Sequence, residues 1–154
     1  MTARLVARSR RRPPAGPMTV DQLRRVLDAE RLEHDVQGEV VSWLRIALDP
    51  RVAWSAVDKG VKLSGDAVKR AKAAAALRRR GVENGLADLR FVLVGGKSAE
   101  IELKRPVGGR VSDDQKEWRR RVEGAGGLYA IARSLDEVRA ILIGWGVEVR
   151  ERGW

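Results

Sequence analysis

The chain of 154 residues contains no cysteine and a single histidine, His34. The absence of cysteine excludes disulfides, thiolate metal sites and cysteine nucleophiles. A single histidine excludes a histidine-rich metal centre, and it leaves serine–histidine catalysis only if His34 itself takes part. We interpret His34 as an ordinary helix or surface residue. The chemistry of this chain must therefore rest on other side chains.

Long hydrophobic runs are also missing. No apolar run approaches membrane-spanning length, and the basic N-terminus lacks the apolar core of a secretory signal. An arginine-rich, acid-poor start is also compatible with an organelle transit peptide. Residues 13–17 (Pro-Pro-Ala-Gly-Pro) favour instead a disordered basic arm that ends in a linker. We therefore expect a cytoplasmic protein, in the bacterial or host cytosol, with no membrane partner.

Acidic residues are outnumbered by basic ones, 21 against 31, which gives a formal charge of +10. Residues 1–12 hold five arginines and no acid, so +5 of the +10 remains for the rest of the chain. A basic surface attracts polyanions, most often nucleic acid, and that binding weakens as salt rises. Basicity that serves solubility alone is the alternative. The length suits one globular domain, which we place at residues 18–146, between a basic arm at 1–17 and a tail at 147–154.

Helices and strands are expected to alternate along the chain. Capping-box spacings and apolar periodicity predict helices that begin at Thr19, cover 33–48, run from a Ser64 cap to Arg80, and cover 112–124 and 134–143. Strands are expected at 51–57, 89–94, 100–104 and 128–132, with the second and third joined as a hairpin. Because apolar residues occupy both parities of 89–94, that strand is expected to be covered on both faces. The order predicts an α/β fold with a mixed sheet flanked by helices.

Two carboxylates and a lysine gather in the predicted hairpin. Glu102 and Lys104 are two residues apart on one strand, so their side chains share a face. If the hairpin closes through residues 95–98, Asp88 lies roughly opposite Arg105 and near Glu102. The carboxylates can then share Mg²⁺, which prefers hard oxygen ligands, and Lys104 can stabilise charge or orient an attacking water. A plain salt bridge is the alternative interpretation.

Five motifs follow one another in a set order: Glu33-x-x-x-Gln37, Gly85-x-x-Asp88-Leu89, Ile101-Glu102-Leu103-Lys104, Ser112-x-x-Gln115-x-x-Trp118 and Gly126-Gly127-x-Tyr129-Ala130-x-Ala132. Together they resemble the VRR-NUC family, a branch of the PD-(D/E)xK nucleases with short phage and bacterial members. The resemblance covers about residues 31–145. It implies a restriction-endonuclease-like fold that hydrolyses phosphodiester bonds in DNA with Mg²⁺ or Mn²⁺.

The resemblance also assigns roles to individual residues. It implies that Asp88 and Glu102 are metal ligands, that Lys104 is the catalytic lysine, and that Glu33 completes the metal site from the first core helix. Three neighbouring acids compete with Glu33 for that position: Glu30, Asp35 and Glu39. Gln115 would be the active-site glutamine. The third position of a capping box is a structural role in itself, and the two roles can coexist.

Two departures from the family pattern stand out. Ala87 replaces the proline that precedes the aspartate, and the loop 58–62 begins with an acid, Asp58, where relatives tend to carry an asparagine–glycine pair before a basic residue. The isolated members of the family act as homodimers on branched DNA, especially four-way (Holliday) junctions, which implies the same here. The altered loop leaves one alternative, a non-catalytic nucleic-acid-binding module that retains the nuclease fold.

Overall fold

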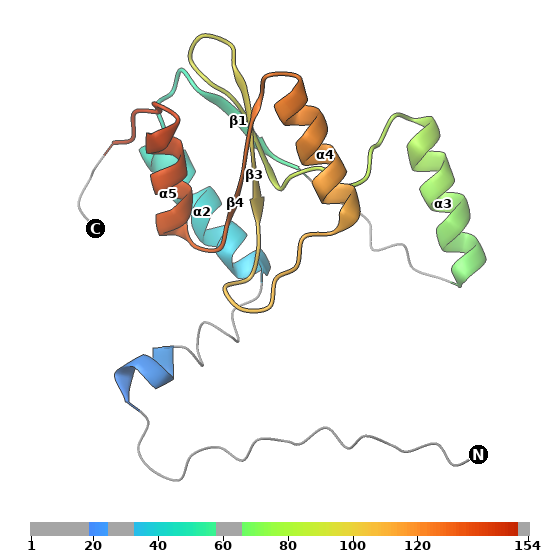
Figure 1. Cartoon of the computed structure of the whole chain (residues 1–154), viewed down its shortest axis with the longest axis horizontal. Helices are drawn as coiled ribbons and strands as arrows, with labels where there is room; N and C mark the ends of the chain where they lie inside the picture. Colours follow the sequence, from blue (N-terminus) through green and yellow to red (C-terminus); the bar gives the residue numbers. More distant parts are fainter. Residues whose placement is uncertain (1–18, 25–32, 58–65, 151–154) are drawn as a thin grey trace.

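A computed structural model describes residues 19–24, 33–57 and 66–150 (Figure 1). The basic arm and the loop 58–62 lie outside the described residues, so the expectations for them are not addressed by the structure. The capping box at Thr19 is present, because the Thr19 N–H donates to Gln22 Oε1 at 2.9 Å and the Gln22 N–H donates to Thr19 Oγ1 at 3.2 Å. Among the described residues, no helix combines the length and apolar character needed to cross a bilayer.

In the described part of the chain, four strands form one sheet with helices on both faces. The elements are α2 (Glu33–Ala47), β1 (Ala53–Ala56), α3 (Ala67–Arg79), β2 (Leu89–Val92), β3 (Ser98–Leu103), α4 (Asp113–Gly124), β4 (Leu128–Ala132) and α5 (Leu135–Gly144). The strand order is β1-β2-β3-β4, antiparallel except for the parallel pair β3–β4. Helices α2 and α5 lie on one face and α4 on the other (Figure 1). The predicted mixed α/β sheet flanked by helices is confirmed.

The hydrophobic core lies between the sheet and the helices α2 and α5. Apolar residues at i, i+3 and i+4 spacings give α2 a continuous apolar stripe, and all its members are buried: Val36, Val40, Trp43, Leu44 and Ala47. The sheet contributes the alternate positions of β2 and β3 that face these helices, namely Leu89, Phe91, Ala99, Ile101 and Leu103. The opposite face of the sheet is therefore free to carry polar side chains beneath α4.

Strand β2 is covered on one face only, which corrects the expectation for residues 89–94. Leu89 and Phe91 are buried, whereas Val92 and Val94 are 50% and 57% exposed. The reason is the path of α4, which connects β3 to β4 and packs against β4, so it leaves the outer face of β2 uncovered. Valine on this face reflects the preference of pleated backbone for β-branched residues rather than burial.

A tight turn joins β2 to β3. The Leu93 N–H donates to the Lys97 carbonyl at 2.9 Å, and the Gly96 N–H donates to the Leu93 carbonyl at 2.8 Å. Gly95 and Gly96 have φ values of 93° and 85°, a region that glycine enters without a steric penalty. The strands therefore begin to pair at Val92 and Ser98, immediately outside this turn.

The register that follows from this turn corrects the predicted position of Asp88. Leu89 pairs with Ile101, and one further step along the same register brings Asp88 opposite Glu102. The expectation that Asp88 faces Arg105 was wrong by three residues. The two carboxylates are consequently direct cross-strand neighbours, on the same face of the hairpin.

Helix starts agree with the expected caps only in part. The N-cap of α3 is Asp66, whose side chain accepts from the Lys69 N–H at 2.9 Å, so the prediction of a Ser64 cap was wrong. Aspartate and serine are comparable N-caps, and the sequence offers both within three residues. Ser134 caps α5 through the Glu137 N–H, but the Glu137 carboxylate accepts from the Arg133 N–H instead of closing a capping box.

The C-terminal segment contributes to packing as far as Arg150. Val147 is buried, Val149 forms an isolated antiparallel bridge with Leu48, and the Arg150 N–H donates to the Ala47 carbonyl at 2.7 Å. Residues 147–150 thus close the end of α2, within the segment that the sequence suggested to be a tail.

The one-sided burial of β2 predicts unequal effects for two neighbouring substitutions. Phe91→Ala should lower the free energy of unfolding by about 3–5 kcal/mol, since it empties a core position. Val92→Ala should cost less than about 1 kcal/mol, because it removes only a favourable strand propensity. Urea denaturation of both variants measures the difference. Equal losses would mean that both faces of β2 are covered.

Two glycines with similar backbone conformations predict a second contrast. Gly81 and Gly85 have φ values of 81° and 76°, but an added Cβ meets open space at Gly81 and overlaps the Asp114 carbonyl at Gly85. Gly81→Ala should cost about 1–2 kcal/mol for the left-handed conformation alone. Gly85→Ala should cost about 1–3 kcal/mol more, because α4 must move. Thermal unfolding of the two variants tests this, and similar losses would contradict close packing of the segment before Asp88 on α4.

Candidate metal centre

Two buried carboxylates face one another across the β2–β3 hairpin. Asp88 precedes β2 and is 4% exposed, and Glu102 lies on β3 with no exposed surface. The Leu103 N–H donates to Asp88 Oδ2 at 2.7 Å, which fixes the Asp88 carboxylate against β3. The Val57 N–H donates to the Asp88 carbonyl at 2.8 Å and holds its backbone. Buried carboxylates are costly unless they are paired or bind a cation, so this pair indicates an electrostatic partner.

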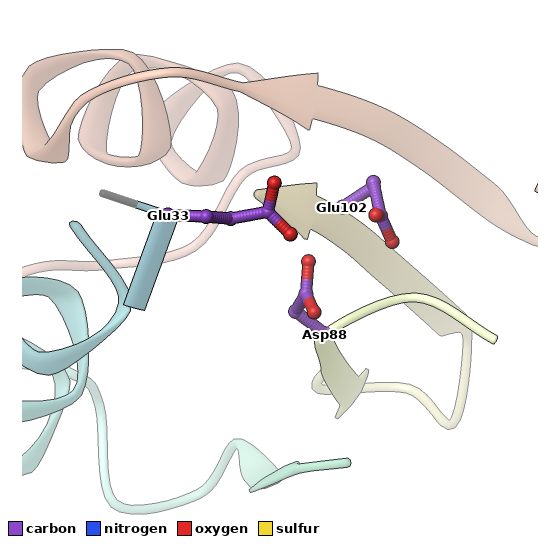
Figure 2. A group of neighbouring side chains, drawn as sticks. All are labelled: Glu33, Asp88 and Glu102. Carbon is purple, nitrogen blue, oxygen red and sulfur yellow. The ribbon is translucent and has the colours of Figure 1, made fainter. Parts of the chain in front are cut away.

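A third carboxylate reaches this pair from the first turn of α2. The half-buried Glu33 side chain extends toward Asp88 and Glu102 (Figure 2). One carboxylate oxygen from each of the three residues lies within 4.8 Å of the other two. Of the competing acids, Asp35 and Glu39 are exposed and Glu30 lies outside the described residues. The structure thus brings together the three residues predicted as metal ligands.

Lys104 occupies the same face of the hairpin as Glu102. Its Nζ lies 2.7 Å from Glu102 Oε1, and its side chain is only 7% exposed. The salt bridge considered as the alternative therefore exists, but it forms one part of a larger cluster. Three negative charges and one positive charge leave a net charge of −2 when all four groups are ionised. A site of this charge, built from hard oxygen donors, is suited to one divalent cation such as Mg²⁺.

Gln115 combines helix capping with a contact to the Glu102 carboxylate of the candidate metal centre. The Ser112 N–H donates to Gln115 Oε1 at 2.9 Å and the Gln115 N–H donates to Ser112 Oγ at 3.2 Å, which completes the capping box of α4. The same side chain donates from Nε2 to Glu102 Oε1. Gln115 can therefore cap α4 and contact Glu102 at the same time. Glu102 Oε1 accepts from both Gln115 and Lys104, and these contacts fix the orientation of its carboxylate.

The segment before Asp88 is placed by close packing rather than by a proline. Ala87, where the resemblance led us to expect a proline, is fully buried. Gly85 packs directly on the first turn of α4, where any side chain would overlap the Asp114 backbone. This contact joins the two parts of the site, because the same turn of α4 carries Gln115. The burial of Ala87 and the packing of Gly85 thus fix this segment without a proline.

Sequence reasoning missed a further buried carboxylate, Glu100, which is 1% exposed. It accepts from Arg90 Nε at 2.9 Å and from Trp118 Nε1 at 2.6 Å. The sequence could have indicated it, because Glu100, Glu102 and Lys104 are spaced two residues apart along one strand and must share a face. Trp118 is half-buried, and its indole N–H, which donates to Glu100, connects α4 to β3.

Tyr129 lies on β4 beside these acids. It pairs in register with Glu100 and is buried. Burial, and then the nearby charges of Glu102, Glu100 and Asp88, raise the pKa of its phenol well above the ordinary value. Tyr129 therefore remains protonated at any pH at which the protein would work, and its role in this site is that of a neutral neighbour.

Comparison with known proteins agrees with this geometry. The sequence matches the family described as VRR-NUC domain over residues 18–136. A solved structure described as a VRR_NUC domain protein shares the fold, with a TM-score of 0.53 and 21% sequence identity over 75% of this chain and 88% of that chain. No curated protein matches the sequence significantly. From the extent of the family match, the chain belongs to the VRR-NUC domain family, whose domains are of the nuclease type.

Proposed function

We propose that this protein is a metal-dependent DNA endonuclease that hydrolyses phosphodiester bonds. The observation that carries the proposal is the convergence of Glu33, Asp88 and Glu102 at one point, with Lys104 paired to Glu102. The three carboxylates come from α2, from the entry to β2 and from β3, so only the folded chain assembles them. Two buried acids, a half-buried acid and a buried lysine converge here from separate elements, which sets this cluster apart from the exposed ion pairs of the protein.

The donor set fits Mg²⁺ or Mn²⁺. All three groups offer hard oxygen ligands, and their net charge with Lys104 is the opposite of that of a divalent ion. A bound ion would polarise the scissile phosphate and lower the pKa of an attacking water. Glu33, Asp88 and Glu102 would hold it, and the Leu103 N–H and the Gln115 amide keep two of these carboxylates oriented.

Lys104 and Gln115 are proposed to act at the edge of this cluster. The Lys104 ammonium is held at Glu102 and nearly buried, so it presents a fixed positive charge where negative charge develops on the phosphate. Gln115 shares the same Glu102 oxygen and is rigid because it also caps α4. These positions and the family pattern support catalytic roles for Asp88, Glu102, Lys104 and Gln115.

The proposed substrate is branched DNA, with four-way junctions as the preferred form, cut by a homodimer. Support for DNA comes from the nuclease family and from the formal charge of +10. Support for junctions and for a dimer comes from the resemblance to the isolated members of the family. Two active sites in one dimer would suit paired cuts on opposed strands.

Asp88→Asn and Glu102→Gln should each lower cleavage by more than about 100-fold. Loss of groups that merely support metal ligands already costs about 10–100-fold, and these two are the proposed ligands themselves. DNA binding should be largely retained, and Mn²⁺ binding measured by calorimetry should weaken. Glu148→Gln, which removes an exposed carboxylate outside the cluster, should cleave like the wild type. Thermal unfolding of each variant controls for loss of fold, since Glu102→Gln leaves Lys104 without its charged partner.

The same assay, run on labelled four-way junction, linear duplex and flap DNA with Mg²⁺ or Mn²⁺, tests the substrate. Paired symmetric cuts in the junction support the full proposal. Cutting of linear duplex or flap alone would retain the nuclease and discard the junction preference. Tight binding without cleavage, and without carboxylate-dependent binding of Mn²⁺, would identify a non-catalytic binding module instead.

A pair of variants separates the two contacts of Gln115. Ser112→Ala removes half of the capping box and should cost about 0.5–2 kcal/mol of stability, with cleavage nearly unchanged because the hydrogen bond from Gln115 to Glu102 remains. Gln115→Met keeps the side-chain length but removes both side-chain hydrogen bonds, and should also lower cleavage by about 10–100-fold. Unfolding free energies and single-turnover rates provide the comparison. If the loss of cleavage in both variants merely tracks their loss of stability, Gln115 acts only as a helix cap.

A further inference from the structure

Helix α3 forms without contributing a buried residue to the core. None of its residues is buried, and in Figure 1 it stands apart from the sheet, on the side of α4. Six of its thirteen residues are alanine, the residue with the highest helix propensity, and Asp66 caps its start. Local propensity therefore explains why the helix forms, but it does not explain why the chain keeps an exposed helix at this place.

The charge on α3 is of one sign. Residues 67–80 contain six basic side chains and no acid: Lys69, Arg70, Lys72, Arg78, Arg79 and Arg80. The last three suit the negative end of the helix dipole. The first three do not, because they lie toward the positive end of the dipole, where cations are unfavourable. Asp66, the N-cap, is the one acid within three or four residues of Lys69 and Arg70, and Lys72 has none at that spacing. The helix therefore carries more positive charge near its start than its own stability requires.

The basic residues of α4 provide a comparison within the same protein. All four form ion pairs: Lys116 with Asp113, Arg119 with Glu123, Arg120 with Glu117 and Arg121 with Glu83. In the described part of the chain, no ion pair involves a basic residue of α3. The positive charge of α4 is thus neutralised on the protein, whereas that of α3 remains available to an external polyanion.

The chain connects α3 directly to the candidate metal centre. Asp88 follows Arg80 by eight residues, and the connecting segment is held on α4 by the packing of Gly85 and by the ion pair between Glu83 and Arg121. A helix of thirteen residues is about 20 Å long, which corresponds to about six base pairs of duplex DNA. One group of cations lies near each end of this length.

We infer that α3 binds the phosphate backbone of a DNA duplex next to the metal centre. This inference rests on the proposed function, because it takes DNA as the ligand. The interaction is electrostatic and independent of sequence, and it adds a second point of attachment for a substrate whose scissile phosphate lies at the acidic cluster. A second copy of this chain is the competing occupant of α3, and sedimentation distinguishes it from DNA.

The test uses the full chain with three substitutions, Lys69→Gln, Arg70→Gln and Lys72→Gln. These remove the charges that oppose the helix dipole, so α3 should remain folded, which circular dichroism verifies. The control is a second triple variant, Arg45→Gln, Lys97→Gln and Arg150→Gln, which removes the same charge from α2, the hairpin turn and the C-terminal segment. Affinity for a labelled four-way junction and for a linear duplex is measured by fluorescence anisotropy in EDTA over a series of KCl concentrations.

The α3 variant should bind both DNAs at least about tenfold more weakly at low salt. The slope of log affinity against log salt should fall by about 2–3, close to one for each phosphate that the variant no longer neutralises. The control should change that slope by less than about 1. Equal effects in both triples, or no effect of the α3 triple, would overturn the inference. So would sedimentation showing that the α3 triple alone dissociates a dimer. If the wild type binds DNA through α3 but never cleaves it, the nuclease proposal fails and this inference stands.

Discussion

The register of the β2–β3 hairpin determines where the whole site lies. Side chains alternate between the faces of a strand, so a shift of one residue would move Glu102 and Lys104 into the apolar core and expose Ile101 in their place. The turn at residues 93–97 sets the register, and the bond from the Leu103 N–H to the Asp88 carboxylate locks it at the open end of the hairpin. That single bond places one candidate ligand directly opposite the other.

The apolar core and the acidic cluster lie on opposite faces of the sheet. Helices α2 and α5 pack an apolar core on one face, and the free energy gained by this burial offsets the cost of burying charged acids on the other. On the other face, α4 is attached through polar contacts, from Trp118 to Glu100 and from Gln115 to Glu102. Its position therefore depends on the same carboxylates that it orients. A substitution that removes a carboxylate of β3 should therefore displace α4 more than it disturbs the apolar core.

Much of this arrangement could be predicted from the sequence, and the errors have physical causes. The apolar stripe of α2, the hairpin and the sheet were predictable because, in these segments, the hydrophobic period and the turn residues point to the same elements. The position of Asp88 was not, because a Gly-Gly turn permits several loop lengths, and the α3 cap was not, because Ser64 and Asp66 are comparable caps. The identities of Glu33 and Gln115 came from the family pattern alone. Glu100 was overlooked although its alternation with Glu102 was visible.

The distribution of charge also resolves a conflict in the proposed chemistry. A cluster of three acids repels a phosphodiester, and a site that must admit DNA needs positive charge nearby that is not already neutralised. Lys104 lies inside the cluster, but its charge is already paired with Glu102. The cations of α4 are engaged with acids of the protein, so they add little field at a distance. The cations on α3 then become the natural source of attraction, because they draw the duplex to the protein without competing for the carboxylates that are proposed to bind the metal.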